Sequence, residues 1–214
     1  MNKQVSKTVI SCVAFIALVL GLTLNRILMP VVLTNEQLSE NGLFVYDVPR
    51  RISDFSLLDQ NGNSVDLNLL KDKWSLIFFG YTYCPDICPL TMATLNQFSE
   101  LIEGELGFEK EPQVIMVSVD PQRDSLDKLR DYVGYFNDAY LGLTGEYIDI
   151  FNFASQLNIA FAYVPGGEDY LVTHSGEIAL INPNGHFHGF FKVPHDPVKM
   201  AENFEIITSA WDRL

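Results

Sequence analysis

The chain contains few cysteines for its length. Only three occur in 214 residues, and one of them, Cys12, lies in a long apolar run near the N-terminus. The two that remain are too few for the disulfide framework that holds together small secreted scaffolds. In an oxidising compartment, these two cysteines would either pair with each other or be kept reduced for a purpose.

Basic side chains are also scarce. The chain has 14 Lys and Arg residues against 27 Asp and Glu residues, which gives a formal net charge of −13 at pH 7. Three of the basic residues and none of the acidic ones lie in residues 1–35, so the rest of the chain is still more acidic. Nucleic acid phosphates and anionic lipid surfaces repel such a domain. We therefore exclude nucleic acid as a ligand and expect a cationic protein partner or a metal cation, although acidity also serves solubility.

One long apolar run is present, from Thr8 to Leu24, and it carries no charge. Lys3 and Lys7 precede it and Arg26 follows it. The run is near the lower limit of the roughly 17–25 residues that a membrane-spanning helix needs. A cleaved signal peptide is the alternative, but no small-residue cleavage site follows the run. We expect an uncleaved single-pass anchor, with the two lysines in the cytoplasm and the rest of the chain outside it.

Beyond the anchor, strand-like and helix-like segments alternate. The strand-like segments lie at 54–67 (a hairpin), 74–81, 114–119, 160–164, 171–174, 177–182 and 186–192, and the helix-like ones at 89–104, 125–136, 146–157 and 194–213. Such alternation predicts an α/β domain with a central mixed sheet. The chain is thus expected to consist of a cytoplasmic tip and anchor (1–35), a tether (36–50) and one folded domain (51–214).

The two remaining cysteines lie in the stretch YTYCPDICPLTM, between a buried strand and a helix. Ligands and reactive groups in α/β sheets collect at such carboxyl ends of strands. Pro89 disfavours the helical conformation at Cys88, so we expect Cys88 to be the N-cap of the helix. Its sulfur would then face the positive end of the helix dipole, which lowers the pKa of a thiol.

The spacing of Cys84 and Cys88 allows two kinds of chemistry. Three intervening residues permit a disulfide, and they also leave room for two sulfurs to hold one soft ion. Zinc usually takes four protein ligands in a closed site. Cu(I) accepts two thiolates and one imidazole. The residues alone leave open a redox pair, a metal clamp or, least favoured, two ordinary buried thiols.

Four histidines could supply a further ligand. We expect His186 and His188, which alternate on a hairpin strand, to be surface residues beside a turn. His195 lies in a loop next to a proline and is expected to be solvated. His174 ends an apolar segment and precedes a Ser-Gly turn, which is typical of a half-buried histidine. It lies far from the cysteines in sequence, so only the fold can bring the three residues together.

Four motifs carry a resemblance to a known family. They are FFGYTYCPDICP at 78–89, VSVDPQRDS at 117–125, LGLTG at 141–145 and DYLVTHSGEIALINPNG at 169–185. Together, over about residues 52–211, they resemble the Sco (SenC) family of copper-delivery proteins.

The resemblance implies a thioredoxin-like domain that is held by one N-terminal span at the bacterial inner membrane and faces the periplasm. By position, Cys84, Cys88 and His174 match the family's copper ligands, for Cu(I) and in some states Cu(II). The implied partners are the copper-centre (CuA) subunit of cytochrome c oxidase and an upstream copper donor or thiol reductant. Asp120, in the matching DPxRD segment, is a candidate to act behind the ligands or to face a partner, or else to stabilise the turn after a strand.

One departure bears on the choice of function. Many relatives carry an acidic residue just before the histidine, where this chain has Thr173. Thioredoxins have a Thr–cis-Pro step in this region, whereas here Thr173 is followed by His174, which favours metal binding. The leading hypothesis is a copper chaperone for oxidase assembly. The alternative is a thiol–disulfide oxidoreductase, whose activity would survive the loss of His174; a peroxidase is a weaker third option.

Overall fold

The computed structural model describes residues 3–28, 33–106, 111–167 and 170–212. The chain divides into two units, Thr34–Glu205 and a second one made of Met1–Leu33 with Ile206–Leu214, and each is described by itself. The second unit contains the helix α1 (Lys3–Leu28). Among the described residues, no helix meets the length and apolarity required to cross a membrane. Residues 1–2 and 29–32 of the expected tip and anchor segment lie outside the described residues.

The unit Thr34–Glu205 is built on an eight-stranded sheet with the order β1-β10-β9-β4-β5-β6-β2-β3. Its strands are β1 (Leu43–Arg51), β2 (Leu57–Asp59), β3 (Ser64–Val65), β4 (Ser75–Gly80), β5 (Gln113–Ser118), β6 (Leu141–Thr144), β9 (Ile178–Ile181) and β10 (His186–Phe191). The pairs β4–β5 and β5–β6 are parallel and the other pairs antiparallel. The predicted central mixed sheet is therefore confirmed. The strands β7 (Phe161–Val164) and β8 (Leu171–His174) form a separate antiparallel pair.

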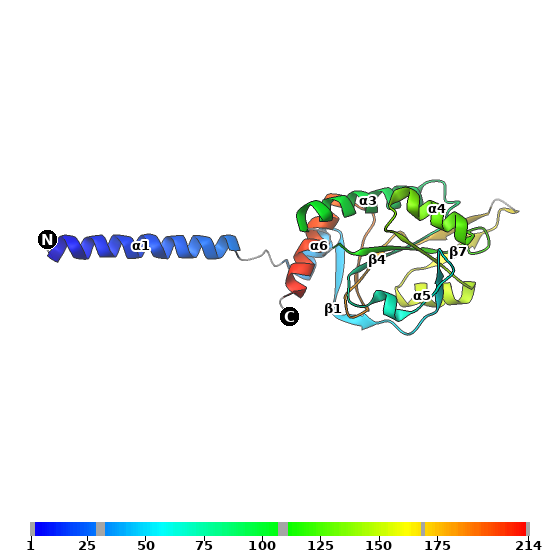
Figure 1. The fold of residues 1–214 in the computed structure, drawn as a ribbon, viewed down its shortest axis with the longest axis horizontal. Helices are drawn as coiled ribbons and strands as arrows, with labels where there is room; N and C mark the ends of the chain where they lie inside the picture. Colours follow the sequence, from blue (N-terminus) through cyan, green and yellow to red (C-terminus); the bar gives the residue numbers. More distant parts are fainter. Residues whose placement is uncertain (1–2, 29–32, 107–110, 168–169, 213–214) are drawn as a thin grey trace. The chain divides into compact units, whose positions relative to one another are not determined.

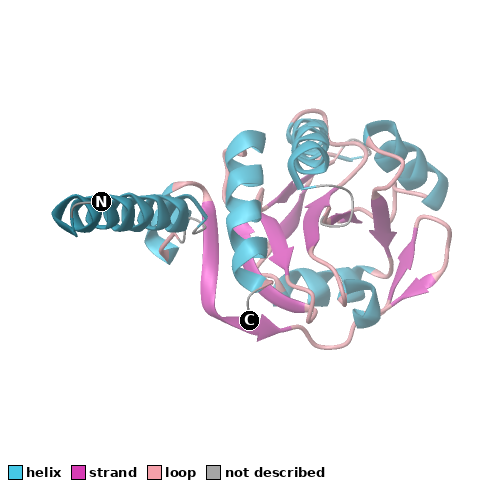
Figure 2. Cartoon of the chain, turned by 60° about the vertical axis from the view of Figure 1, so that its left-hand side comes forward, coloured by secondary structure: helices cyan, strands magenta, loops and turns pink. Residues whose placement is uncertain are grey.

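Helices lie on both faces of this sheet. The helices that follow α1 in the chain are α2 (Asn35–Glu40), α3 (Ile87–Leu106), α4 (Leu126–Phe136), α5 (Tyr147–Gln156) and α6 (Pro197–Trp211), with a short 3₁₀ turn at Leu67–Leu70. Figure 1 shows α3 and α4 on one face and α5 on the other, and Figure 2 shows the central strands with helices above and below them. This layering explains why every residue of β4 is buried and why its sequence is an almost unbroken apolar run.

Residues 36–50, which we expected to be a tether, instead form most of α2 and β1. Thr34 and Gln37 make a reciprocal capping box that starts α2. The strand β1 pairs with β10 at the edge of the sheet, with an irregular register between Val45 and Arg50. Pro49 lies in this interval, and an edge strand tolerates proline because one side of it is unpaired. Because its register is irregular, β1 lacks the regular alternation of apolar and polar residues by which a strand is predicted from sequence.

Candidate metal centre

The cysteines lie where β4 ends and α3 begins. The helix starts at Ile87, and the N–H of Leu90 already donates to the carbonyl of Asp86, at 3.3 Å. Cys88 is therefore inside the first turn, so the prediction that it is the N-cap is wrong. Pro89 disfavours a helical backbone at Cys88, but the burial of Cys88 outweighs this preference. Proline itself is tolerated in the first turn of a helix.

The sulfur at the helix N-terminus belongs to Cys84. The backbone N–H of Cys88 donates to Cys84 Sγ at 3.4 Å. Cys84 is half-buried, and its thiol pKa is held well below its ordinary value. The chief cause is a hydrogen bond from the Cys88 thiol, supported by the backbone N–H groups of Asp86 and Cys88, against the opposing effect of burial. A thiolate at this position also benefits from the positive end of the helix dipole.

Cys88 has the opposite environment. It is fully buried, and its pKa is raised by the hydrogen bond with Cys84 and by burial. Gly80 leaves the space for its sulfur, since a Cβ at this glycine would lie 3.1 Å from Cys88 Sγ and 2.7 Å from Phe78 Cε1. The expectation of a lowered thiol pKa at Cys88 is therefore wrong, because the N-terminus of the helix faces the sulfur of Cys84 instead.

The third group is His174, at the end of β8. Its Nε2 lies 3.3 Å from Cys88 Sγ. Its Nδ1 is 2.9 Å from the carbonyl oxygen of Ser175, which can only accept, so Nδ1–H is the donor and the lone pair of Nε2 faces the sulfur. The ring also makes edge contacts with Phe78 and Tyr81, at centroid distances of 5.6 and 6.3 Å.

The fold thus brings together three side chains that are distant in sequence. The ligand atoms of Cys84, Cys88 and His174 all lie within 4.8 Å of one another. In the part of the chain that the structure describes, they are the sole group of three or more Cys, His, Asp or Glu side chains arranged in this way. Two sulfurs and one imidazole suit a soft ion such as Cu(I), and they do not complete the four-ligand shell of a structural zinc site.

Asp120 is fully buried just after β5. Its carboxylate accepts a hydrogen bond from the hydroxyl of Tyr170 and pairs with Arg123, both at 2.5 Å. The Arg123 guanidinium in turn lies 3.6 Å from the centroid of the Tyr170 ring. The carboxylate therefore ties the turn after β5 to the residue that precedes β8, and its full burial does not suit direct contact with a partner. An influence of Asp120 on the metal ligands stays a prediction.

Asp124 is a supporting residue that we did not single out from the sequence. Its buried carboxylate accepts hydrogen bonds from the backbone N–H and hydroxyl of Thr82 and from the hydroxyl of Ser118. Burial raises its pKa. Asp124 thereby fixes the loop that carries Cys84 against β5. The motif VSVDPQRDS contains both acids, but nothing in it indicates which one faces the cysteine loop.

The other histidines are less exposed than expected. His188 lies edge-on to Trp74, at 5.1 Å between centroids, and accepts a hydrogen bond from the Asn182 amide at Nδ1. Burial lowers the pKa of His188 to about 4. His195 donates from Nε2 to the carbonyl of Gly176, at 2.8 Å, and burial lowers its pKa too. The predictions of a surface His188 and a solvated His195 are wrong, because neighbours distant in sequence cover both rings.

Comparisons with known proteins agree with this geometry. A family model described as SCO1/SenC matches residues 47–209. An SCO2-like protein of Rickettsia conorii is 30% identical over 202 residues, which cover 93% of this chain and 97% of the relative. The copper-bound crystal structure of Arabidopsis thaliana ScoI matches with a TM-score of 0.68 and 30% identity, over 73% of this chain and 98% of that one.

A further solved structure is that of BsSco, described as a member of the Sco family of cytochrome c oxidase assembly proteins that has a disulfide switch. It matches with a TM-score of 0.60 and 25% identity, over 78% of this chain and 95% of BsSco. The match therefore extends over most of both chains.

Proposed function

Because the chain belongs to the SCO1/SenC family, we propose that it is a copper chaperone that takes part in the assembly of cytochrome c oxidase. The observation that carries this proposal is the triad of Cys84, Cys88 and His174, whose ligand atoms lie within 4.8 Å of one another. Copper is the cargo, bound as Cu(I) by two thiolates and one imidazole. The receiving partner is the copper-centre subunit of the oxidase.

The geometry suits a protein that must release its metal. Three ligands leave the ion open to attack by an incoming ligand, as transfer requires. Cys84 is the thiol poised to lose its proton, whereas Cys88 must give up a proton when the metal binds. Loading therefore requires both cysteines to be reduced, which is the task of an upstream thiol reductant, and an upstream copper donor supplies the ion. Binding releases the proton of Cys88 to solvent.

The decisive experiment is an anaerobic Cu(I) titration of the reduced full-length chain against a competing chelator. We expect one-to-one binding that is weakened by Cys84→Ser, by Cys88→Ser and by His174→Ala. The matched control is His186→Ala, which removes a half-buried histidine outside the triad. If the reduced protein binds no better than the cysteine variants, the proposal fails.

We also propose that the N-terminal segment attaches the domain to the bacterial inner membrane, on its periplasmic side. Supporting this are the uncharged stretch Thr8 to Leu24 and the lysines that precede it. The test is carbonate extraction of membranes, followed by protease treatment of intact spheroplasts. The proposal requires that the chain stay in the membrane pellet and that its domain be digested.

A second function is favoured by the contrast between the two thiols. A half-exposed Cys84 thiolate could attack the disulfide of a partner and form a mixed disulfide. Cys88 would then displace the partner as a dithiol and leave a Cys84–Cys88 disulfide, which an external dithiol must reduce again. A reductase of this kind keeps its activity in His174→Ala, whereas a chaperone loses copper affinity, so one variant separates the two functions.

A further inference from the structure

The turn that follows His174 is held by a second histidine, His195. The Nε2–H of His195 donates to the carbonyl oxygen of Gly176, at 2.8 Å. Gly176 is two residues beyond the metal ligand, whereas His195 comes from the segment between β10 and α6. The contact therefore joins the ligand-bearing turn to a part of the chain that contributes nothing to the triad.

Gly176 makes this turn easy to move unless something holds it. A Cβ at this position would lie 2.7 Å from Val193 Cγ2, so the close approach of the Val193–His195 segment favours glycine here. Glycine, however, has the largest conformational freedom of any residue. An external contact is then needed to select one backbone conformation, and the hydrogen bond from His195 supplies it.

The conformation of this turn matters because it orients the imidazole of His174. The Nδ1–H of His174 donates to the carbonyl of Ser175, at 2.9 Å, and this bond sets both the tautomer and the ring orientation. The other side of the turn is already fixed, since Ser175 exchanges hydrogen bonds with the backbone of Ala160 at 2.8 and 3.2 Å. His195 completes the support from the opposite side.

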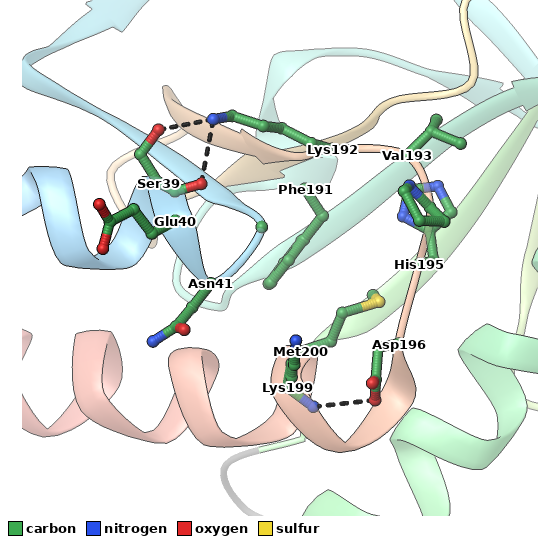
Figure 3. Close-up of a pocket in the computed structure, with 12 residues that line it drawn as sticks. Ser39, Glu40, Asn41, Phe191, Lys192, Val193, His195, Asp196, Lys199 and Met200 are labelled. Carbon is green, nitrogen blue, oxygen red and sulfur yellow. Dashed lines mark hydrogen bonds between the residues drawn. The ribbon is translucent and has the colours of Figure 1, made fainter.

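Close packing alone does not hold the His195 ring in place. The ring lines a cavity of about 500 Å³, together with Val193, Asp196 and Met200. Figure 3 shows His195 at the wall of this cavity, on the stretch of chain that runs from Val193 to Asp196. The cavity adjoins one side of the ring, whereas its Nδ1 is buried without a hydrogen-bond partner among the described residues, so the bond from Nε2 to Gly176 is the directional contact that orients it.

We propose that His195 is a positioning residue for the metal ligand His174. By holding the carbonyl of Gly176, it keeps the turn in the conformation that presents Nε2 of His174 to the two sulfurs. The copper readout of this proposal rests on the proposed chaperone function. The positioning itself does not, because it concerns the metal-free ring.

The first test measures Cu(I) affinity in full-length His195→Ala and His195→Gln, each with and without His174→Ala. Loss of a group that orients a ligand typically lowers metal affinity by about 10- to 100-fold, and we expect a loss in this range for His195→Ala. Glutamine can place an amide N–H near the position of Nε2, so His195→Gln should recover part of the loss. In the His174→Ala background, His195→Ala should cause no further loss.

An equal loss in both backgrounds would overturn the proposal, because His195 would then act on general stability rather than through His174. Unchanged affinity in both backgrounds would overturn it as well. The matched control is His186→Ala, which lies on β10 away from this turn and should change neither background.

The second test needs no copper. In the reduced, metal-free chain, ¹⁵N signals of the His174 ring report its tautomer, which should be the Nδ1–H form in wild type. His195→Ala should mix the two tautomers, and His195→Gln should restore the single form. If copper binding is absent but this change occurs, the chaperone function fails and the positioning stands. If the His174 tautomer is the same in all variants, the positioning is refuted, whatever the copper result.

Discussion

Cys84 and Cys88 are four residues apart, yet their surroundings are opposite. Cys84 is half-buried and accepts the N–H of Cys88 at the start of α3. Cys88 is fully buried, between the space left by Gly80 and the ring of His174. The pKa of the first thiol is lowered and that of the second is raised. One sulfur is thus charged, while the other stays neutral until metal binding or disulfide formation removes its proton.

The largest expected effect concerns copper, for which the two thiols should be equivalent. Cys84→Ser and Cys88→Ser should each lower Cu(I) affinity by more than about 100-fold, since removing a ligand exceeds the usual effect of removing its supporting partners. Stability should separate them. A hydroxyl buried at position 88 should lower the free energy of unfolding by about 1–3 kcal/mol. Cys84→Ser should change it little at a pH near the lowered pKa of Cys84, where the thiolate no longer contributes to stability. Chelator competition and urea denaturation check the two parts, and equal destabilisation would break the comparison.

The next effect tests the space around the buried thiol. Gly80→Ala should lower the free energy of unfolding by about 1–3 kcal/mol, because its Cβ would collide with Phe78 and approach Cys88 Sγ. The matched control is Gly104→Ala in α3, where nothing lies within 4 Å of the added carbon. There we expect a gain of about 0.5–1 kcal/mol. Urea denaturation of both variants decides the matter, and similar values would contradict the packing argument.

The lowered pKa of Cys84 predicts an unusual pH dependence. A free thiol, with a pKa of about 8.5, loses close to tenfold in alkylation rate for each pH unit below that value. Cys84 in the native reduced chain should instead react at a nearly constant rate in this range, while Cys88 stays unmodified. Iodoacetamide labelling followed by peptide mass spectrometry measures both rates. A Cys84 rate that falls with pH like that of the unfolded chain would refute the assignment.

The lowered pKa of Cys84 also makes the free energy of unfolding depend on pH. The folded-state pKa of Cys84 lies below the unfolded value, so its contribution is fully present above the pKa of the unfolded thiol. The contribution is lost as the pH falls toward the lowered value. Relative to Cys84→Ser, the reduced metal-free chain should therefore become less stable on acidification from about pH 8.5, the ordinary thiol pKa.

The smallest expected effect concerns Asp124, which influences the difference in acidity between the two thiols. The charge of Asp124 contributes, as a minor cause, to the raised pKa of Cys88. Asp124→Asn should bring the two thiols slightly closer in acidity, so that copper affinity at a fixed pH rises slightly, because Cys88 gives up its proton more easily. Chelator competition at one pH measures this difference. Asp127→Asn, in an exposed ion pair with Arg130, is the control and should leave the affinity unchanged.

Much of the fold follows from local patterns. Short apolar runs predict β4 and β5, and Ser125, which caps α4, marks the start of a helix as its residue type suggests. The edge strand β1 was not predicted, because its irregular register obscures the alternation of buried and exposed residues. Edge strands are specified by their pairing more than by their own sequence.

The site, like the fold, could be predicted only in part from local sequence. The sequence around Cys84 and Cys88 predicts a reactive corner, because a buried strand and a helix start flank it. Which of the two thiols has the lowered pKa could not be predicted, since it depends on which sulfur the first turn of α3 faces. The position of His174 depends on the pairing of β7 with β8, and the burial of His195 on its contact with Gly176. These are contacts across the fold, which the family motifs indicate only for His174.

The ligands come from two segments that only the completed fold brings together, with Cys88 and His174 separated by 86 positions. An unfolded chain keeps the two neighbouring cysteines but separates them from His174, so copper binds the native state more tightly. A ligand present at about 100 times its dissociation constant stabilises the native state by roughly 2.7 kcal/mol. Donating the cargo withdraws this stabilisation at once. The copper-free form should therefore be degraded more easily than the copper-bound form, and the lifetime of each molecule in the cell would depend on whether it still carries copper.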